Sequence, residues 1–487
     1  MNPRIFGKAL ILGLVIGILV GAVPAYIMAQ TNSKTRITET GIYAPSLNAS
    51  QYWLLSTNIT DILAYPEQTA SYIIFGRDTN GDGVYDVIYA KNCSSGEIEF
   101  SGTDAATVIQ QAIDALPNSG GRIFIKAGEY IISSAIQINK NYITIEGESP
   151  INTCLKLADG ANCNLIEFTA NWGLIRIRHL ELDGNKANNV AGSGIYHGGY
   201  NGIYEDLVIH DFKEHGIEIL ETGGTNNRFI MVESYNNDKS GFYVRKGDQR
   251  YLLCRAFSNG EYGMQLYGSV QYVIEPFVFG NGLSGIYVTG GAVRILGGNI
   301  ATNNRHGIHL NATEAGINIF EIRGVLIREN SKESANTYDA IHLEGDGPPW
   351  ISVGIISENI IDGSTDHRHG IYIHNIGVRR VLISDNDVRF ASVSEPIYVA
   401  GGTDIMIRRN PGYLTENSGT ATLLNGTTSI AFTHGLASTP TVVTANPTTD
   451  LGSASYWWVT YNSTHITIHV NADPGKDVTF NWRAEVN

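Results

Sequence analysis

The sequence predicts an all-β protein: a right-handed parallel β-helix (solenoid) capped by an N-terminal helix, with a C-terminal antiparallel β-sandwich. Three observations predict this fold. Short apolar triplets recur about every 22 residues, an amphipathic helix precedes them, and alternating strands separated by turn signals follow them. The 487 residues include 54 Gly but only 14 Pro, a balance that suits short strands joined by many tight turns.

Residues 1–30 carry a targeting segment. Arg4 and Lys8 precede an apolar run over residues 9–29, and polar sequence follows it. This pattern predicts a signal peptide, and the run is also long enough to remain as a membrane anchor. We therefore expect a protein that is secreted or anchored at the outer cell surface. Six Asn-X-Ser/Thr sequons are candidate glycosylation sites in a host that uses them: Asn48, Asn58, Asn92, Asn311, Asn425 and Asn462.

Residues 31–100 predict a small β-rich module with one candidate calcium loop. In DTNGDGVYD, oxygen ligands recur at the spacing of a calcium-binding loop: Asp78, Asn80, Asp82 and Asp86. Tyr89 stands where such a loop has its bidentate Glu, and the flanking sequence favours strands over helices. A hairpin stabilised by structural Ca²⁺ and an ordinary Asp/Asn/Gly turn both fit this segment.

The solenoid is predicted over residues 101–412, and a helix opens it. Thr103 and Asp104 are candidate N-caps, and the helix ends before Pro117. Its apolar stripe comprises Val108, Ile109, Ala112, Ile113 and Leu116. Short alternating strands with Gly and Asn at the corners come next, so we expect the helix to cap a stack of coils.

An internal repeat predicts the coils. One small residue precedes each apolar, variable, apolar triplet: Gly194, Gly216, Gly241, Gly263, Gly285, Gly307, Ala340 and Gly370. Successive intervals are 22, 25, 22, 22, 22, 33 and 30 residues. Asparagines also fall 22 apart at the preceding turn: Asn237, Asn259, Asn281 and Asn303. A period near 22 residues is one coil of a parallel β-helix.

Alternation within each triplet predicts which side chains point inward. The first residue of each triplet should stack in the core: Ile195, Ile217, Phe242, Met264, Ile286, Ile308, Ile341 and Ile371. The next residue should point out and form a row: Tyr196, Glu218, Tyr243, Gln265, Tyr287, His309, His342 and Tyr372. Rings in that row either stack on sugars or pack on each other.

The last segment, residues 418–487, predicts a separate β-sandwich. A Gly/Asn/Ser linker near residues 412–419 ends the repeat, and alternating strands such as THITIHVN and VTFNWRAEV follow. The four cysteines are too few to support the fold by disulfides. Cys154 and Cys163 bracket a short polar loop and are the best candidate pair, with free buried thiols as the alternative.

The segment DAATVIQQAIDALPNSGGRIFIKAGEYIISSAIQI, followed by YITIEGE, resembles the start of the pectate-lyase-like superfamily, which includes rhamnogalacturonase and epimerase-like β-helix domains. With the repeat, this resemblance covers roughly residues 100–412 and implies a carbohydrate partner. The C-terminal THGL, TPTVV and FNWRAEV segments are similar to the small sandwich modules of phage fibre proteins and H-type lectins. Analogy with viral spikes also implies a homotrimer. The adjacent Asp-Asp pair and Gly-His-Gly of polygalacturonases, and the arginine pattern of pectate lyases, are missing.

The segment HLEGD carries the first catalytic hypothesis. Its outward carboxyls alternate on one strand face at roughly 7 Å, a separation that suits glycoside hydrolysis. The candidate catalytic residues are His342, Glu344 and Asp346. The candidate substrate-binding residues are Tyr243, Tyr287, His309, Tyr372, His374 and Trp350. A solvated strand end that runs into a turn explains HLEGD equally simply.

A second hypothesis rests on the charged run Asp366 to His369, which includes His367 and Arg368. Arg beside a base can promote β-elimination on a uronate, since a cation stabilises the enolate that forms. The alternative is a charged corner of the solenoid.

Together these observations predict an extracellular or cell-surface protein that binds polysaccharide along the β-helix face. If it is an enzyme, it is a polysaccharide lyase or glycoside hydrolase. The alternative is a non-catalytic adhesin, filament subunit or virion receptor-binding spike. With a formal net charge of −14 and no Lys/Arg-rich run, we expect no nucleic-acid partner, and acidic polymers need local cationic groups.

Overall fold

A computed structural model describes residues 36–38, 41–43, 70–81, 84–348, 350–363 and 365–486. The chain divides into two units, residues 1–69 and 70–487. In the first unit, β1 (Arg36–Thr38) and β2 (Gly41–Tyr43) form an antiparallel pair. The predicted export segment and the sequons at Asn48 and Asn58 lie outside the described residues. None of the helices in the described ranges is long and apolar enough to span a membrane.

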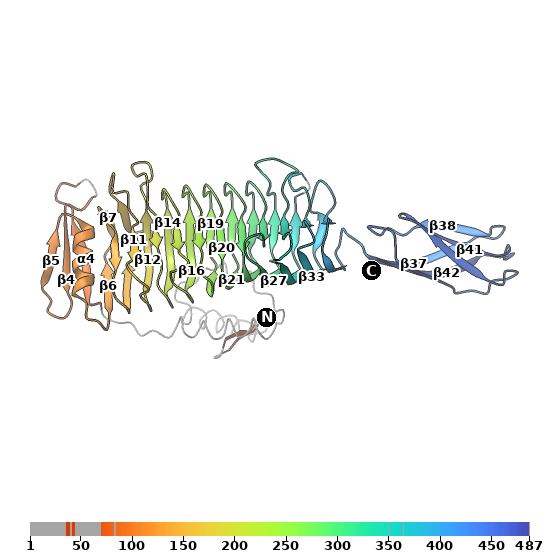
Figure 1. The fold of residues 1–487 in the computed structure, drawn as a ribbon, viewed down its shortest axis with the longest axis horizontal. Coiled ribbons are helices and arrows are strands. Elements are labelled where there is room, and N and C mark those ends of the chain that lie inside the picture. Colours follow the sequence, from red (N-terminus) through yellow and green to blue (C-terminus); the bar gives the residue numbers. More distant parts are fainter. Residues whose placement is uncertain are drawn as a thin grey trace, which may run out of the picture. The chain divides into compact units, whose positions relative to one another are not determined.

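The second unit contains a β-solenoid made of two sheets (Figure 1). The smaller sheet has 11 strands, all paired in parallel: β8 (Ile136–Ile138), β11 (Ile166–Phe168), β13 (Ile195–Tyr196), β15 (Ile217–Ile219), β17 (Phe242–Val244), β20 (Met264–Tyr267), β23 (Ile286–Thr289), β26 (Ile308–Asn311), β29 (Ile341–Glu344), β32 (Ile371–Ile373) and β35 (Ile397–Val399). Each is one coil from the next, so the parallel β-helix is confirmed.

The larger sheet has 23 strands, and it receives one or two from each coil. They are β3 (Tyr72–Arg77), β4 (Val87–Asn92), β5 (Ile98–Gly102), β6 (Gly121–Ile125), β7 (Gly128–Ile132), β9 (Ile143–Gly147), β10 (Thr153–Leu157), β12 (Arg176–Asp183), β14 (Ile203–His210), β16 (Arg228–Tyr235), β18 (Gln249–Leu252), β19 (Arg255–Phe257), β21 (Val270–Ile274), β22 (Phe277–Phe279), β24 (Gly291–Leu296), β25 (Asn299–Ala301), β27 (Ile317–Arg323), β28 (Leu326–Arg328), β30 (Ile351–Ser357), β31 (Ile360–Asp362), β33 (Val378–Ser384), β34 (Asp387–Phe390) and β36 (Thr403–Arg408). Both sheets close around one hydrophobic core.

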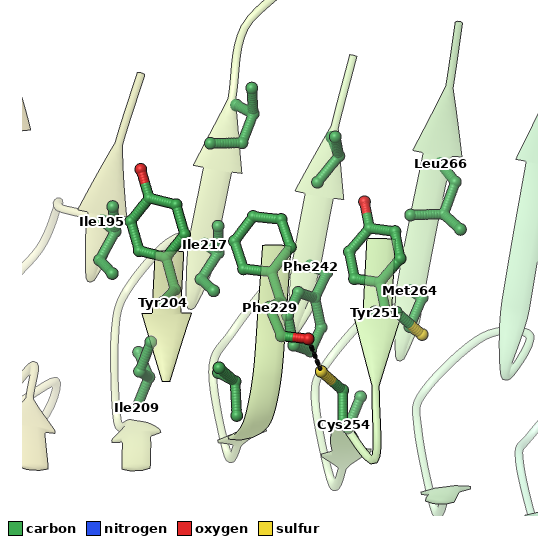
Figure 2. Close-up of a cluster of buried hydrophobic side chains, with 14 of the residues drawn as sticks. Ile195, Tyr204, Ile209, Ile217, Phe229, Phe242, Tyr251, Cys254, Met264 and Leu266 are labelled. Atoms are coloured by element: carbon green, nitrogen blue, oxygen red, sulfur yellow. Dashed lines mark hydrogen bonds between the residues drawn. The ribbon is translucent and has the colours of Figure 1, made fainter. Parts of the chain in front are cut away.

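Stacked side chains fill that core. All eight residues predicted to point inward, from Ile195 to Ile371, are fully buried. Aromatic rings from the larger sheet add a second stack, which Figure 2 shows side by side. Phe229 lies parallel to Tyr204 and to Tyr251, with ring centroids 4.9 and 5.1 Å apart. Each coil packs mainly on its two neighbours, so a sequence that repeats once per coil produces the same packing at each coil.

A buried asparagine ladder runs along one corner of the solenoid. It comprises Asn237, Asn259, Asn281, Asn303 and Asn330. In each step the side-chain amide donates to the side-chain oxygen of the next asparagine, at 2.8 to 3.0 Å. The asparagines at the predicted spacing therefore form a chain of hydrogen bonds, which satisfies polar groups inside the turns.

The predicted helix is α4 (Ala105–Ala115), and Asp104 is its N-cap. The Asp104 carboxylate accepts from Thr107 N–H at 3.0 Å, and the predicted apolar stripe is buried. Strand β3 pairs in parallel with β6, and the antiparallel strands β4 and β5 follow it. Buried residues of β3 and β4 belong to the solenoid core. Within the predicted module over 31–100, β3, β4 and β5 thus extend the larger sheet, whereas β1 and β2 form a sheet of their own.

The C-terminal sandwich consists of two antiparallel sheets. One contains β37 (Glu416–Leu423), β42 (Val478–Glu485) and β39 (Val442–Pro447), and the other contains β38 (Ser429–Thr433), β41 (His465–Val470) and β40 (Trp457–Tyr461). Residues from both sheets, among them Leu423, Ile468 and Phe480, form a second hydrophobic core. The predicted sandwich is therefore present and has a core of its own.

The predicted disulfide between Cys154 and Cys163 is not formed. Both residues carry free thiols in the structure, as do Cys93 and Cys254. Cys154 lies on β10 between Glu129 and Glu181 of the neighbouring strands and alternates with inward-facing Leu155. Cys163 instead packs against the solenoid core. Cys154 thus faces away from the core while Cys163 lies against it, and free thiols, the alternative that the sequence left open, describe both residues.

Candidate functional site

The smaller sheet carries the predicted outward row. Strand register places its members directly beside one another on successive coils, from Tyr196 through His309, His342 and Tyr372 to Tyr398. The ring centroids of Tyr287 and His309, neighbours in the row, are 5.2 Å apart. Tyr267, two residues after Gln265 on β20, lies beside the row with its ring centroid 6.4 Å from that of Tyr287. The row is therefore continuous, and its rings pack on each other as well as facing outward.

A histidine cluster (His306, His309, His342 and His374) interrupts the aromatic part of the row. His306 lies before β26, His309 on β26, His342 on β29 and His374 directly after β32. The His342 ring is central, with its centroid 4.3 Å from His306, 4.9 Å from His309 and 5.5 Å from His374. His342 itself is only 6% exposed, so the imidazole is held in place by its neighbours.

Asp339 is a fully buried carboxylate behind this cluster. It accepts hydrogen bonds from His342 Nδ1 at 2.7 Å, from Arg368 Nη2 at 2.8 Å and from the backbone N–H of His369 at 3.1 Å. Burial by itself raises the pKa of Asp339, but the bonds from His342 and Arg368 outweigh burial and keep that pKa below its ordinary value. An ionised Asp339 therefore orients both His342 and Arg368.

Glu344 is the second carboxylate of the site. His309 Nε2 lies 3.2 Å from Glu344 Oε2, Asn311 Nδ2 donates to the same oxygen at 3.2 Å, and His374 Nδ1 lies 3.6 Å from Oε1. Burial lowers the pKa of His309, and the hydrogen bond with His309 lowers the pKa of Glu344. Both shifts fit a neutral His309 that donates Nε2–H to an ionised Glu344.

Arg368, His369 and Tyr372 form the adjoining part of the site. The Arg368 guanidinium lies 4.6 Å from the centroid of the Tyr372 ring. His369 stacks on Tyr372 at 5.2 Å and on Tyr398 at 4.9 Å. Its Nδ1 lies 2.9 Å from the carbonyl oxygen of Glu395, which leaves Nε2 to accept a proton. A fixed cation, an imidazole and a phenol thus meet at one edge of the row.

Of the three candidate catalytic residues in HLEGD, the structure brings two into the site. His342 is the centre of the histidine cluster, and Glu344 contacts its members His309 and His374. Asp346 lies past the end of β29, and its carboxylate accepts from Asn375 Nδ2. Trp350 lies beneath the Arg379 guanidinium of β33, 4.6 Å away, beside the larger sheet. Strand alternation does not extend past a strand end, so it could not place either residue.

The second hypothesis also needs a correction. His367 is fully buried and points into the solenoid, where its Nε2 accepts from the backbone N–H of Asn330 at 2.9 Å and ends the asparagine ladder. Asp366 is paired with Lys332 at 2.9 Å. Arg368 and His369 remain in the site. The sequence reasoning also left Asp339 and His306 without a role, although both precede a triplet of the repeat.

The candidate calcium loop is a β-hairpin between β3 and β4, as the flanking sequence predicted. Asp78 Oδ1 accepts from Asn80 N–H at 3.2 Å, and Asp86 Oδ2 accepts from Thr79 N–H at 2.6 Å. These contacts within the loop fit a self-contained turn, whereas Asp82 lies outside the described residues. Calcium binding at this hairpin stays a prediction.

Four sequons lie in the described residues. Asn425 and Asn462 are exposed. Asn92 is bonded to Glu99, at 2.7 Å from its amide, and Asn311 is bonded to Glu344. A glycan on Asn311 would stand beside the histidine cluster. Glycosylation of these sites stays a prediction.

Three groups of side chains in the described residues have the spacing of metal ligands. They are His306, Asp339 and His342; His309, His342 and Glu344; and Asp183, His210 and Asp211. In each group the ligand atoms lie within 4.8 Å of one another. Two of the three groups share His342.

Comparison with known proteins supports the fold. Residues 164–321 match a family model described as the right handed beta helix region. No curated protein matches the chain. Among solved structures, the A-module of mannuronan C-5 epimerase AlgE4 from Azotobacter vinelandii is 20% identical, with a TM-score of 0.49, over 63% of this chain and 94% of that one.

Two tailspike proteins are also similar. The Dettilon tailspike protein gp208 is 11% identical, with a TM-score of 0.46, over 79% of this chain and 92% of that one. Tailspike protein gp49 from Acinetobacter baumannii bacteriophage Fri1, a capsular polysaccharide depolymerase, is 9% identical, with a TM-score of 0.41, over 79% and 83%. At such TM-scores these similarities transfer no activity, substrate or partner to this chain.

Proposed function

We propose that this chain acts on uronate-containing polysaccharide outside the cell, binds it along the outward row of the smaller sheet, and cleaves it by β-elimination. The observation that carries the proposal is the placement of Arg368. Buried Asp339 holds this guanidinium over the Tyr372 ring, next to His369, at the edge of the outward row. The superfamily resemblance in the sequence supports a carbohydrate partner.

The outward row suits a chain of sugars. The C–H faces of sugar rings pack on aromatic side chains, and hydroxyls bond to imidazole and amide groups. Successive members of the row are one strand spacing apart, about 4.8 Å. A polymer that follows the solenoid axis would therefore meet a new side chain at each coil. Against a net charge of −14, Arg368 supplies the local cation that a uronate needs.

The elimination assigns one task to each side chain. His369 Nε2 removes the proton next to the uronate carboxylate, and Arg368 stabilises the enolate that forms. The electron pair then makes a carbon–carbon double bond while the bond to the leaving sugar oxygen breaks. Burial raises the pKa of Tyr372, so its hydroxyl is protonated and can donate a proton to that oxygen. Hydrolysis is less well supported, because its acid needs a raised pKa and the pKa of Glu344 is lowered.

Product release tests this proposal. Wild-type protein should release unsaturated uronate, detected by ultraviolet absorbance, from uronate polymers in a panel that also contains neutral polysaccharides. His369→Gln should lower the rate by at least about 100-fold, the effect of removing a general base. Arg368→Gln should lower it too. Arg389→Gln removes an arginine from an exposed Arg–Asp pair outside this site and should leave the rate unchanged.

Other results would contradict the elimination. New reducing ends without unsaturated products would indicate hydrolysis. Equal rates for wild type and His369→Gln would remove His369 as the base. Binding of a polymer without release of any product would favour the non-catalytic alternative, an adhesin, filament subunit or spike. One observation favours that alternative: Tyr267 packs edge to face on both Tyr243 and Tyr287, which also stiffens a purely structural solenoid.

The apolar run over residues 9–29 supports export of the chain. We extend the proposal to secretion or surface anchoring. Mass spectrometry of the mature protein distinguishes the two, because a secreted form should lack about the first 25 to 30 residues. The homotrimer implied by resemblance to spikes is tested by light scattering of the same material.

A further inference from the structure

We propose that His309, His342, His374 and Glu344 bind a divalent transition-metal ion, with Zn²⁺ as the best fit. The four side chains come from β26, from β29 and from the residue after β32, so three neighbouring coils supply them. The inference goes beyond the proposed function, since no step of the elimination uses a metal.

The distances between the side chains match a coordination shell. Ligand atoms of His309, His342 and Glu344 all lie within 4.8 Å of one another. His309 Nε2 is 3.2 Å from one Glu344 oxygen, and His374 Nδ1 is 3.6 Å from the other. Ligands at about 2.1 Å from a tetrahedral Zn²⁺ are ~3.4 Å apart. Small side-chain rotations therefore suffice to close the shell around an ion.

Contacts behind the ligands have the form that metal sites use. A metal-bound histidine commonly donates its other ring N–H to a carboxylate, which fixes the ring. Asp339 accepts in this way from His342 Nδ1 at 2.7 Å, so Nε2 is the nitrogen left to bind the ion. Asn311 Nδ2 likewise donates to Glu344, at 3.2 Å. These contacts hold two of the four ligands before any ion arrives.

The donor set selects the kind of ion. Three imidazoles and one carboxylate suit Zn²⁺, Co²⁺, Ni²⁺ or Cu²⁺, whereas Ca²⁺ and Mg²⁺ prefer oxygen ligands. Exposure of the side chains gives an entry path, because 43% of His374 is exposed but only 7% of His342. An ion from solvent would meet His374 and Glu344 first and reach His342 last.

A third group supplies a matched control. Asp183, His210 and Asp211 also have ligand spacing, but both ring nitrogens of His210 already contact carboxylates. His210 Nε2 lies 2.9 Å from Glu181 and Nδ1 lies 2.7 Å from Asp211, and the ring stacks on Tyr235 at 4.9 Å. No ring nitrogen of His210 is left for an ion, whereas His342 Nε2 is left at the histidine cluster, where only the bond between two of the ligands, His309 and Glu344, has to open. We therefore expect the ion to bind at the histidine cluster.

The test is titration of the full chain, stripped with EDTA and free of polysaccharide, with Co²⁺ and then with Zn²⁺. Wild type should bind about one equivalent of Co²⁺ with the intense visible absorption of tetrahedral cobalt, and Zn²⁺ should displace it and raise the melting temperature. His374→Ala and Glu344→Gln should each weaken binding by at least about 100-fold. His210→Gln should bind as wild type does.

Three outcomes would overturn the site. They are no binding by folded wild type, wild-type affinity in both His374→Ala and Glu344→Gln, or loss of binding in His210→Gln alone. Displacement of Co²⁺ by Ca²⁺ would overturn the choice of a transition metal. Since His374 is exposed, its replacement should leave the far-ultraviolet circular dichroism unchanged. Product release is measured separately, so failure of the elimination leaves this result intact, and the converse also holds.

Discussion

The environment of His215, at a corner of the solenoid, strongly lowers the pKa of its imidazole. His215 lies directly before the glycine that precedes the triplet of its coil, as His306 and His369 do in theirs. The Ser240 backbone N–H donates to His215 Nδ1 at 3.1 Å, and the ring stacks on Tyr243 at 4.4 Å. Burial, assisted by the nearby charge of Lys239, lowers the pKa of His215 to about 3. The folded protein therefore keeps this imidazole neutral.

A pH dependence of stability follows from that pKa. Unfolded, His215 takes a proton near pH 6.5. Between about pH 6.5 and 3, the unfolded state thus binds more protons than the folded state, and the free energy of unfolding falls as pH drops. His215→Gln removes this contribution. We expect the urea midpoint of the variant to fall less than that of wild type between about pH 7 and 4.

His210 provides a control of opposite sign. Burial lowers its pKa, but hydrogen bonds with Glu181 and Asp211 outweigh burial and raise it above the ordinary value. Protonated His210 therefore stabilises the fold below about pH 6.5, and this contribution is lost as pH rises through the folded pKa. His210→Gln should lack this contribution, so the variant should gain less stability than wild type as pH falls toward about 6.5. Shifts in the same direction for both variants would contradict these assignments.

At the scale of elements, the asparagine ladder links coils that the sheets already join. Asn259 donates both its backbone N–H and its side-chain amide to Asn281 Oδ1, at 3.1 and 3.0 Å. Asn281 repeats the pattern on Asn303. From Asn259 to Asn330, each side-chain oxygen of the ladder thus satisfies two buried donors of the preceding coil.

Removing one member should be costly for that reason. Asn281→Ala strands two donors of Asn259, and we expect the free energy of unfolding to fall by about 1–3 kcal/mol, measured by urea denaturation. The control is Asn304→Ala, since Asn304 directly follows Asn303 in the sequence but is not a member of the ladder. The free energy of unfolding of this variant should stay within about 0.5 kcal/mol of wild type. Equal losses of unfolding free energy in the two variants would show that the hydrogen bonds of the ladder make no specific contribution to stability.

The coils were predictable from the sequence because their packing repeats. In the triplet IYV, for example, alternation predicts that Ile286 points inward and Tyr287 outward, and the structure confirms this. The same alternation repeats in the other coils. The site was only partly predictable, since it lies where the interval changes from 22 to 33 and 30 residues. There the positions of Asp346 and His367 depend on turn geometry, which alternation does not describe.

One signal for the site was present in the sequence. In seven of the eight coils, the residue before the small residue is polar and buried: Ser193, His215, Ser240, Ser284, His306, Asp339 and His369. The exception is Tyr262, before Gly263. Aligning coils by the repeat puts Asp339 between His306 and His369. That alignment predicts neighbours, but it does not predict that Asp339 takes its hydrogen bonds from His342 and Arg368, because those depend on side-chain rotamers.

For the whole molecule, the important feature is two separate hydrophobic cores. The solenoid core extends from β3 and α4 to β35, and the sandwich core is formed by residues of β37 to β42. A solenoid is held by contacts between neighbouring coils, whereas a small sandwich folds around one centre. We therefore expect the two cores to unfold in separate transitions.

Two probes can resolve the transitions. Three of the six tryptophans, Trp457, Trp458 and Trp482, lie in the sandwich, whereas most strands belong to the solenoid. Tryptophan fluorescence should therefore weight sandwich unfolding, and far-ultraviolet circular dichroism should weight solenoid unfolding. Midpoints in guanidinium chloride that differ between the probes would establish more than one cooperative unit.

Paired cavity variants then assign each transition to its core. Phe480 is fully buried in the sandwich, and Phe229 is fully buried between Tyr204 and Tyr251 in the solenoid. Replacing either by alanine should cost about 3–5 kcal/mol in its own core. Phe480→Ala should shift the fluorescence midpoint and leave the main dichroism transition in place, and Phe229→Ala should do the reverse. If each variant instead shifted both transitions together, the two cores would form one cooperative unit despite their separate packing.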